Sequence, residues 1–238
     1  MDVLGGRSIT IVGGGRMGSA LTDALKKAGV AVVGPLGRNE PIRGDLVLFT
    51  VPDREISAAV GGAPPEAIVG HTAGAMTLAA LAPHEAFSFH PLMTASHGRA
   101  TFAGASAAIA GSTPRALAIA RAIATRLSME PLEIPDAGRM AYHAAASIAA
   151  NFLVTLESMA ARVGAAGGLE RRHLLPLARA ALENWGATGP GALTGPIARG
   201  DDEIVKQQRA AVAASAPELL AVWDAMAAAT AAIARGGQ

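Results

Sequence analysis

An apolar strand, a glycine-rich turn and a helix follow one another near the start of the chain, and they constrain its fold more than any other feature. Residues 8–12 form a short, β-branched run that is typical of a buried parallel strand. The pattern G-x-G-x-x-G follows, with Gly13, Gly15 and Gly18 in the glycine positions, and apolar residues then recur at helical spacing over residues 21–28. In this context the glycines permit a tight turn and a close backbone approach. We therefore expect the helix N-terminus to receive the pyrophosphate of a dinucleotide.

The composition indicates a folded protein that is rich in helix. The chain has 238 residues, of which 51% are hydrophobic and 16% charged, as in globular proteins. Alanine, a strong helix former, supplies much of the apolar content. The net charge is +1 and no run of Lys or Arg stands out, which argues against a nucleic-acid partner. The chain has no cysteine, which excludes disulfides and a thiol nucleophile.

Two alanine-rich stretches, near residues 141–161 and 210–234, are apolar but include Asn151, Glu157 and Asp224. Alanine is too weakly apolar to carry such side chains across a bilayer. We therefore expect buried helices and no membrane partner. Because no signal segment precedes the first strand, we expect a cytoplasmic protein.

Strand and helix patterns alternate up to about residue 134, after which only helical patterns occur. Strand patterns lie at residues 30–34, 45–53, 67–72, 86–90, 107–110 and 132–134, and helix patterns at 114–127, 138–163, 169–185, 201–214 and 217–234. Strands separated by helices predict an α/β fold with a doubly wound parallel Rossmann sheet. We predict a dinucleotide-binding domain over residues 1–135, followed by an all-α domain over residues 136–238 for substrate binding and dimerisation.

The end of the second predicted strand favours NADP over NAD. An NAD site usually places Asp or Glu there to bind the ribose, whereas this chain has Arg38, and we expect Glu40 to lie beyond the ribose. The planar guanidinium of Arg38 suits a 2′-phosphate. Arg16 in the glycine loop adds a second cation, unless both arginines belong simply to the surface. The missing acid also argues against FAD, and a methyltransferase would more usually carry an acid in or before its glycine loop.

Other residues at predicted strand ends are candidates for lining the cofactor. Val51 and Pro52 are expected to pack against its adenosine side, and Thr72, with His71, to contact the nicotinamide or its ribose. The histidines at positions 71, 90 and 143 match no local metal-ligand spacing, so we expect no metal site.

Short motifs spread over nearly the whole chain resemble one family. They lie at residues 13–18 (GGGRMG), 51–53, 71–75, 89–92, 144–146 with 151–152, and 192–201 (ALTGPIARGD). The chain resembles bacterial proteins that pair a Rossmann-like domain with a C-terminal helical domain of unknown function. These are similar to 6-phosphogluconate dehydrogenase, ketopantoate reductase and pyrroline-5-carboxylate reductase. The resemblance implies a nicotinamide cofactor held by the loop that includes Met17, and a homodimer, but it says little about the substrate.

One face of the predicted helix over residues 138–163 carries His143, Ser147 and Asn151 at spacings of four. In ketopantoate-reductase-like enzymes, the corresponding helix carries a lysine that protonates the alkoxide and two amides that hold the substrate. The resemblance puts His143 in the place of the lysine, and Ser147 and Asn151 in the places of the amides. Imidazole can act as a general acid near neutral pH. Tyr142 is an alternative donor off that face, and a histidine paired within the helix packing is the other interpretation.

Candidates for binding the substrate lie elsewhere in the chain. His90 ends a strand at the expected cofactor crevice, where it binds a carboxylate or orients a carbonyl, unless it is simply a loop histidine. Thr194 and Arg199 lie between later helices. Arg199 suits a substrate carboxylate, but it equally suits a pair with Asp201 or a helix cap, and Asp201 is a natural N-cap.

These patterns together predict an NAD(P)-dependent oxidoreductase, with NADP favoured. It transfers a hydride between the cofactor and a C=O or C=N group of a small carboxylated metabolite. The catalytic candidates are His143, Ser147, Asn151 and His90. The alternative is a nucleotide-binding sensor or scaffold without turnover, an interpretation that the histidine in place of lysine keeps open.

Overall fold

The computed structural model describes residues 3–4, 6–95 and 100–236, and its contacts divide the chain into two compact units. Residues 1–148, here the sheet unit, hold every strand, and residues 149–238, here the helical unit, hold none among their described residues. The division falls after Ile148, whereas the sequence predicts it after residue 135. The difference arises because the first turns of the helix beyond the sheet pack onto the sheet unit, where Arg139 is buried.

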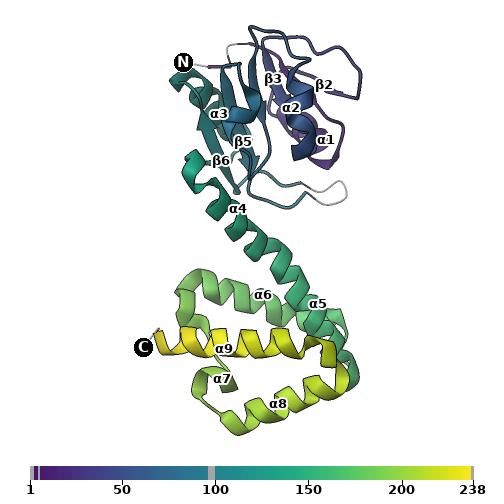
Figure 1. Ribbon diagram of the computed structural model, residues 1–238, viewed down its shortest axis with the longest axis vertical. Coiled ribbons are helices and arrows are strands. Elements are labelled where there is room, and N and C mark those ends of the chain that lie inside the picture. Colours follow the sequence, from purple (N-terminus) through teal and green to yellow (C-terminus); the bar gives the residue numbers. More distant parts are fainter. Residues whose placement is uncertain (1–2, 5, 96–99, 237–238) are drawn as a thin grey trace. The chain divides into compact units, whose positions relative to one another are not determined.

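Seven strands form a single sheet in the order β2-β1-β3-β4-β5-β6-β7 (Figure 1). The strands are β1 (Ile9–Val12), β2 (Val32–Leu36), β3 (Leu46–Phe49), β4 (Ile68–His71), β5 (Ala86–Pro91), β6 (Ser106–Gly111) and β7 (Glu130–Glu133). Neighbours are parallel except β5 and β6, which are antiparallel. A parallel neighbour needs a long, usually helical crossover, and the described residues between β5 and β6 form no helix. The predicted Rossmann sheet is confirmed, with one reversed strand pair.

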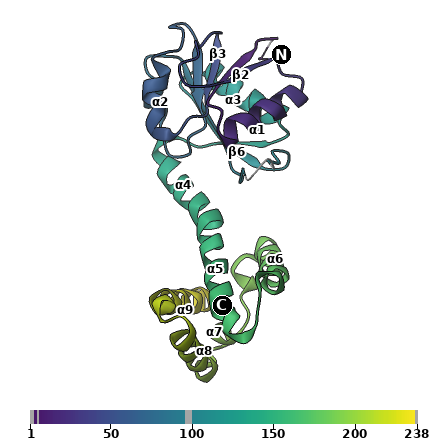
Figure 2. The same ribbon diagram turned by 90° about the vertical axis from the view of Figure 1, so that its right-hand side faces the viewer.

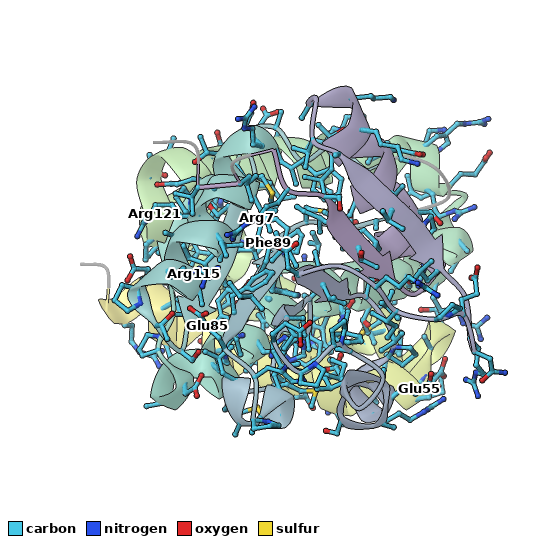
Figure 3. All side chains as sticks on the ribbon, turned by 90° about the horizontal axis from the view of Figure 1, so that it is seen from above. Arg7, Glu55, Glu85, Phe89, Arg115 and Arg121 are labelled. Carbon is cyan, nitrogen blue, oxygen red and sulfur yellow. The ribbon has the colours of Figure 1, made fainter. Side chains whose placement is uncertain are left out.

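Helices cover both faces of this sheet (Figure 2). Helices α1 (Arg16–Lys27) and α3 (Pro114–Arg126) pack on one face, and α2 (Asp53–Val60) with a short 3-10 turn (Leu78–Leu81) packs on the other. Each face buries its own apolar cluster. Phe89 of β5 is fully buried in the cluster under α1 and α3 (Figure 3). The helices packed on the two faces fix the ends of the strands, where the candidate site lies.

The turn between β1 and α1 leaves no room for side chains at two of its glycines. A Cβ at Gly18 would lie 1.9 Å from the Gly13 carbonyl oxygen, and Gly13 itself has a φ of +114°. The Thr50 hydroxyl at the end of β3 donates to the carbonyls of Val12 (3.0 Å) and Gly13 (2.9 Å). The loop is therefore held tightly against both its own helix and the neighbouring strand.

The chain after the sheet is helical, close to the predicted boundaries. It forms α4 (Arg139–Ser147), a π-helical segment (Ile148–Phe152), α5 (Leu153–Gly164), α6 (Arg171–Thr188), α7 (Pro196–Arg199), α8 (Asp202–Ser215) and α9 (Leu220–Gly236). Arg209 of α8 pairs with both carboxylate oxygens of Asp224 in α9, at 2.8 Å each. The π-helical segment interrupts what the sequence predicts to be one α-helix.

The helical unit buries almost nothing within one chain. Among its described residues, only Val212 and Ala216 are buried, whereas Leu177 is 69% and Trp185 65% exposed. The predicted burial of the alanine-rich helices is therefore wrong for a single chain. Two helical stretches, Asp136–Gly167 and Pro217–Gly236, are long and apolar enough to cross a membrane by length and composition alone. This is weak evidence for a span, because helices of soluble proteins pass the same test.

The close approach at Gly18 leads to a prediction about stability. We expect Gly18→Ala to lower the free energy of unfolding of the sheet unit by at least about 2 kcal/mol, because the new methyl group overlaps backbone atoms. Gly14→Ala is the matched control, because a Cβ there meets nothing within 4 Å. Urea titrations followed by far-UV circular dichroism measure both variants. Equal midpoints for the two would contradict the tight packing of the loop.

Candidate functional site

A cavity of about 800 Å³ opens at the ends of β1, β2 and β3. We call it the glycine-loop cavity. Its lining includes five of the residues predicted to bind a cofactor: Gly13, Gly15, Arg38, Val51 and Pro52. Val51 also packs against the apolar cluster under α2. The structure therefore brings the glycine loop and the end of β2 to one hollow, as the sequence predicts.

The glycine loop has the features that a diphosphate requires. A Cβ at Gly14 or Gly15 would meet nothing within 4 Å, so the missing side chains leave the backbone open. Gly15 is the N-cap of α1 and provides no side-chain cap, and the first turn has no acidic residue. The first N–H groups of α1 are thus available to an anion, and the helix dipole favours negative charge there.

Three other predicted cofactor residues lie differently. Arg16 lines a separate cavity of about 550 Å³ beside α1 and the end of α3. Met17 is half-buried, and its side chain packs against the apolar cluster under α1 and α3. The Thr72 hydroxyl donates to the Phe49 carbonyl at 3.5 Å. The structure does not place these three side chains in the lining of the glycine-loop cavity.

The position of Glu40, after the end of β2, differs from the sequence prediction. Glu40 does not lie beyond the cavity but lines it, because its carboxylate folds back and accepts a hydrogen bond from the Gly37 N–H. Arg38 forms an ion pair with Glu55 of α2, at 3.2 Å between Nη2 and Oε2. Contrary to the expectation, an acidic side chain therefore lines the cavity after β2.

A second group of polar side chains, here the histidine cluster, gathers where β4 and β5 end and α4 begins. It consists of His71, His90, Arg139, Tyr142 and His143. His90 Nδ1 and the Tyr142 hydroxyl are hydrogen-bonded at 2.6 Å, and the two rings meet edge to face. The His90 and His143 ring centroids are 6.3 Å apart. Two predicted catalytic residues, His90 and His143, thus lie together, and Tyr142 joins them through His90.

The loop after β4 closes over this cluster. A Cβ at Gly74 would lie 2.5 Å from His143 Cδ2 and 3.0 Å from His90 Nε2. Any side chain at position 74 would therefore displace an imidazole. This glycine is a feature of the site that the sequence analysis did not single out, although it lies in the TAGA run after the strand.

Arg139 is the residue that holds the cluster together, and sequence reasoning missed it. Its side chain is 1% exposed, bonds the Ser88 hydroxyl, donates to the Gly74 carbonyl at 3.4 Å, and lies 3.6 Å from the Asp136 carboxylate. These contacts fasten the start of α4 to β5 and to the loop after β4. An arginine in the first turn of a helix gives no sign of such burial in sequence.

Burial sets the protonation of this group. Desolvation, reinforced by the neighbouring His143 and Arg139, lowers the pKa of His90 to about 4. Desolvation and Arg139 also lower the pKa of His71 to about 4. Desolvation raises the pKa of Tyr142 to about 12. At neutral pH both imidazoles are neutral and the phenol keeps its proton.

The remaining predicted residues are not brought into these contacts. Ser147 lies one turn beyond His143 in α4. Asn151 falls in the π-helical segment, which takes more residues per turn than an α-helix, so the spacing argument no longer aligns it with the other two. Thr194 and Arg199 are exposed in the helical unit, and their roles stay predictions. Asp201 caps α8 as expected, accepting from the Ile204 N–H.

The part of the chain that the structure describes contains no group of three His, Cys, Asp or Glu side chains arranged to hold a metal ion.

Comparison with known proteins places the fold. A family model described as a domain of unknown function, DUF2520, matches residues 105–230. BF3122 from Bacteroides fragilis, a candidate NADP oxidoreductase, is similar in structure, with a TM-score of 0.81, 21% identity, and coverage of 94% of this chain and 98% of that one. TM1727 from Thermotoga maritima gives a TM-score of 0.77 at 22% identity, covering 96% of this chain and 99% of that one.

A third similar structure is a reductive aminase from Aspergillus terreus in complex with NADPH and ethyl levulinate. Its TM-score is 0.65 at 18% identity, and the match covers 92% of this chain and 91% of that one. No curated protein matches the sequence. At these identities the structural likeness establishes the fold, and it confirms a Rossmann domain followed by a helical region.

The lowered pKa values lead to a prediction about pH. The unfolded chain binds protons at these histidines near pH 6.5, whereas the folded chain binds them only near pH 4. Their contribution to stability is therefore complete above about pH 6.5 and is lost as the pH falls to about 4, by about 3 kcal/mol for each histidine.

Hydrogen exchange of the β4 and β5 amides measures this effect in the sheet unit. Tryptophan fluorescence would report on the helical unit instead, because Trp185 and Trp223 both lie there. We expect His90→Asn to lose less stability than the wild type on acidification. His173→Asn in α6 is the control and should follow the wild type. A His90→Asn profile identical to the wild-type profile would contradict the assignment.

Proposed function

We propose that this chain, which belongs to the DUF2520 family, is an NAD(P)-dependent oxidoreductase acting on a C=O or C=N group of a small carboxylated metabolite. The observation that carries the proposal is the uncapped N-terminus of α1 under an open glycine backbone, at the edge of a cavity of about 800 Å³. A second support is the likeness to proteins named as NADP oxidoreductases or solved with NADPH.

The residues present fit a nicotinamide dinucleotide. Gly13, Gly15 and Gly18 shape the loop for the diphosphate, and Arg38 in the lining of the cavity supplies a cation suited to a 2′-phosphate. When bound, the cofactor supplies or accepts the hydride. NADP is favoured because Arg38 follows β2 and because similar structures contain NADPH.

The histidine cluster supplies the proton. A neutral His90 with its proton on Nδ1 donates a hydrogen bond to the Tyr142 oxygen, and Tyr142 gives its O–H proton to the substrate oxygen or nitrogen as charge develops there. The same hydrogen bond then stabilises the phenolate that remains. His143, beside His90, is the second candidate donor. Arg139 positions the cluster without contacting the substrate.

Substrate binding is proposed for Ser147, Asn151, Thr194 and Arg199. Arg199 carries a guanidinium suited to a carboxylate, and among the described residues it makes no ion pair. These assignments rest on the sequence patterns and the resemblance.

One observation favours the alternative, a nucleotide-binding sensor without turnover. The pKa values of His90 and Tyr142, about 4 and about 12, lie far from neutrality, where a general acid works best. In a sensor, the hydrogen bond between them would serve only to fix α4 on the sheet.

We also propose that the helical unit forms a homodimer in the cytoplasm. With only Val212 and Ala216 buried among its described residues, this unit does not stabilise itself by apolar burial. A second copy would cover the apolar side chains that one chain leaves exposed. The polar residues along both apolar stretches favour a protein partner over a bilayer.

The oxidoreductase proposal predicts binding and turnover that separate it from the sensor. We expect NADPH to bind, as measured by its fluorescence, and to be oxidised with a member of a panel of 2-oxo acids and cyclic imines. Tyr142→Phe should lower kcat by about 100-fold or more, because it removes the proton donor, without changing NADPH affinity. Binding without turnover on any substrate would favour the sensor. A larger loss in His143→Asn than in Tyr142→Phe would make His143 the donor.

The dimer proposal predicts a mass in solution of twice that of the chain, by size exclusion with light scattering. We expect Leu177→Gln on α6 to raise the dimer dissociation constant by about tenfold or more, because it removes buried apolar area. Arg179→Gln on the same helix is the matched control. A monomer that binds lipid vesicles would contradict the proposal and favour a membrane role.

A further inference from the structure

We propose that the Glu40 carboxylate competes with the 2′-phosphate of NADP for the end of β2, and so limits how strongly the site prefers NADP to NAD. The inference rests on the proposed function, since it concerns the same cavity. It adds a specificity-determining residue that opposes Arg38.

The loop after β2 is closed by two reciprocal hydrogen bonds. The Gly37 N–H donates to the Glu40 carboxylate, and the Glu40 N–H donates to the Gly37 carbonyl at 3.5 Å. Asn39 between them has a φ of +70°, a left-handed conformation that asparagine tolerates better than most residues. The turn thus directs the Glu40 carboxylate back to the first residue after the strand.

Arg38 is held by a second carboxylate. Its guanidinium pairs with Glu55 of α2, while its side chain remains 80% exposed. Figure 3 shows Glu55 near the edge of the view, and its side chain lines the cavity. The charged side chains in the described lining of the cavity are these three: Arg38, Glu40 and Glu55.

A 2′-phosphate and a ribose diol place opposite demands on this arrangement. The phosphate is an acceptor that needs N–H donors and positive charge, but the Gly37 N–H and Arg38 both already face a carboxylate. Phosphate binding therefore requires Glu40 to leave the Gly37 N–H, and it is opposed by like charge. The two hydroxyls of an NAD ribose are donors, and a carboxylate accepts from them. Glu40 therefore penalises NADP and assists NAD.

The test compares the affinities of the full chain for NADPH and NADH, measured by fluorescence titration. In Glu40→Gln the amide oxygen still accepts from the Gly37 N–H, so the turn is kept while the charge is removed. We expect the ratio of Kd for NADH to Kd for NADPH to rise about fivefold, the size of an exposed charge interaction. Arg38→Gln should lower the same ratio. Glu66→Gln, an exposed acid outside the cavity, is the control and should leave the ratio unchanged.

Two nucleotides without nicotinamide make the test independent of the histidine cluster and of turnover. Adenosine 2′,5′-bisphosphate and AMP are titrated calorimetrically against the wild type and Glu40→Gln. We expect only the bisphosphate to gain affinity in the variant. Glu40→Ala, which also removes the acceptor, should show the same gain if charge is the cause.

The outcomes separate this inference from the proposed function. If NADPH binds but its preference over NADH is the same within twofold in the wild type, Glu40→Gln and Glu40→Ala, the role of Glu40 is overturned and the oxidoreductase proposal stands. If none of the four nucleotides binds the wild type or Glu40→Gln, both proposals are overturned.

Discussion

The contact on which the sheet unit depends is the one between Gly18 and the carbonyl of Gly13. Because nothing larger than hydrogen fits there, α1 approaches the loop at the end of β1 closely and presents its first N–H groups beside the open glycines. Thr50 fixes the same loop from β3. The placing of the first turn of α1 beside the open glycines at the edge of the cavity follows from that approach.

A buried cation organises the other half of the site. Arg139 bonds β5 and the loop after β4 and brings the start of α4 against them, so Tyr142 and His143 meet His90. Its charge also disfavours protonation of the two buried histidines. Burial is the main cause of the lowered pKa values of His71 and His90, and the charge of Arg139 adds to it. A change at Arg139 would therefore alter packing and protonation together.

The sequence predicts the layout of the fold well, because apolar periodicity and the glycine motif reflect backbone geometry directly. The strands, α3 and the later helices lie within a few residues of their predicted ranges. The reversed direction of β6 carries no such signal, since an antiparallel strand has the same apolar pattern. The π-helical segment is equally invisible, and it undoes the alignment inferred for Asn151.

The site is less predictable from the sequence than the fold. It depends on side-chain contacts, some between residues far apart in the sequence and some within the turn after β2. Nothing in the sequence pairs Arg139 with Ser88, or folds Glu40 back onto Gly37. His90 and His143 were identified from their places at a strand end and on a helix. The sequence puts Tyr142 off the helix face that carries His143. It nevertheless reaches His90, because His90 belongs to β5 and not to the helix.

The uneven distribution of buried apolar residues has a consequence for how the protein matures. The sheet unit has two apolar clusters of its own and can acquire its structure in a unimolecular reaction. The helical unit has two buried residues among those described. If it dimerises as proposed, part of its stability comes from the second chain, and its folding then depends on protein concentration. Newly made chains at low abundance would therefore carry a finished N-terminal half and an unfinished C-terminal one, a state that exposes the alanine-rich segments to proteases until assembly.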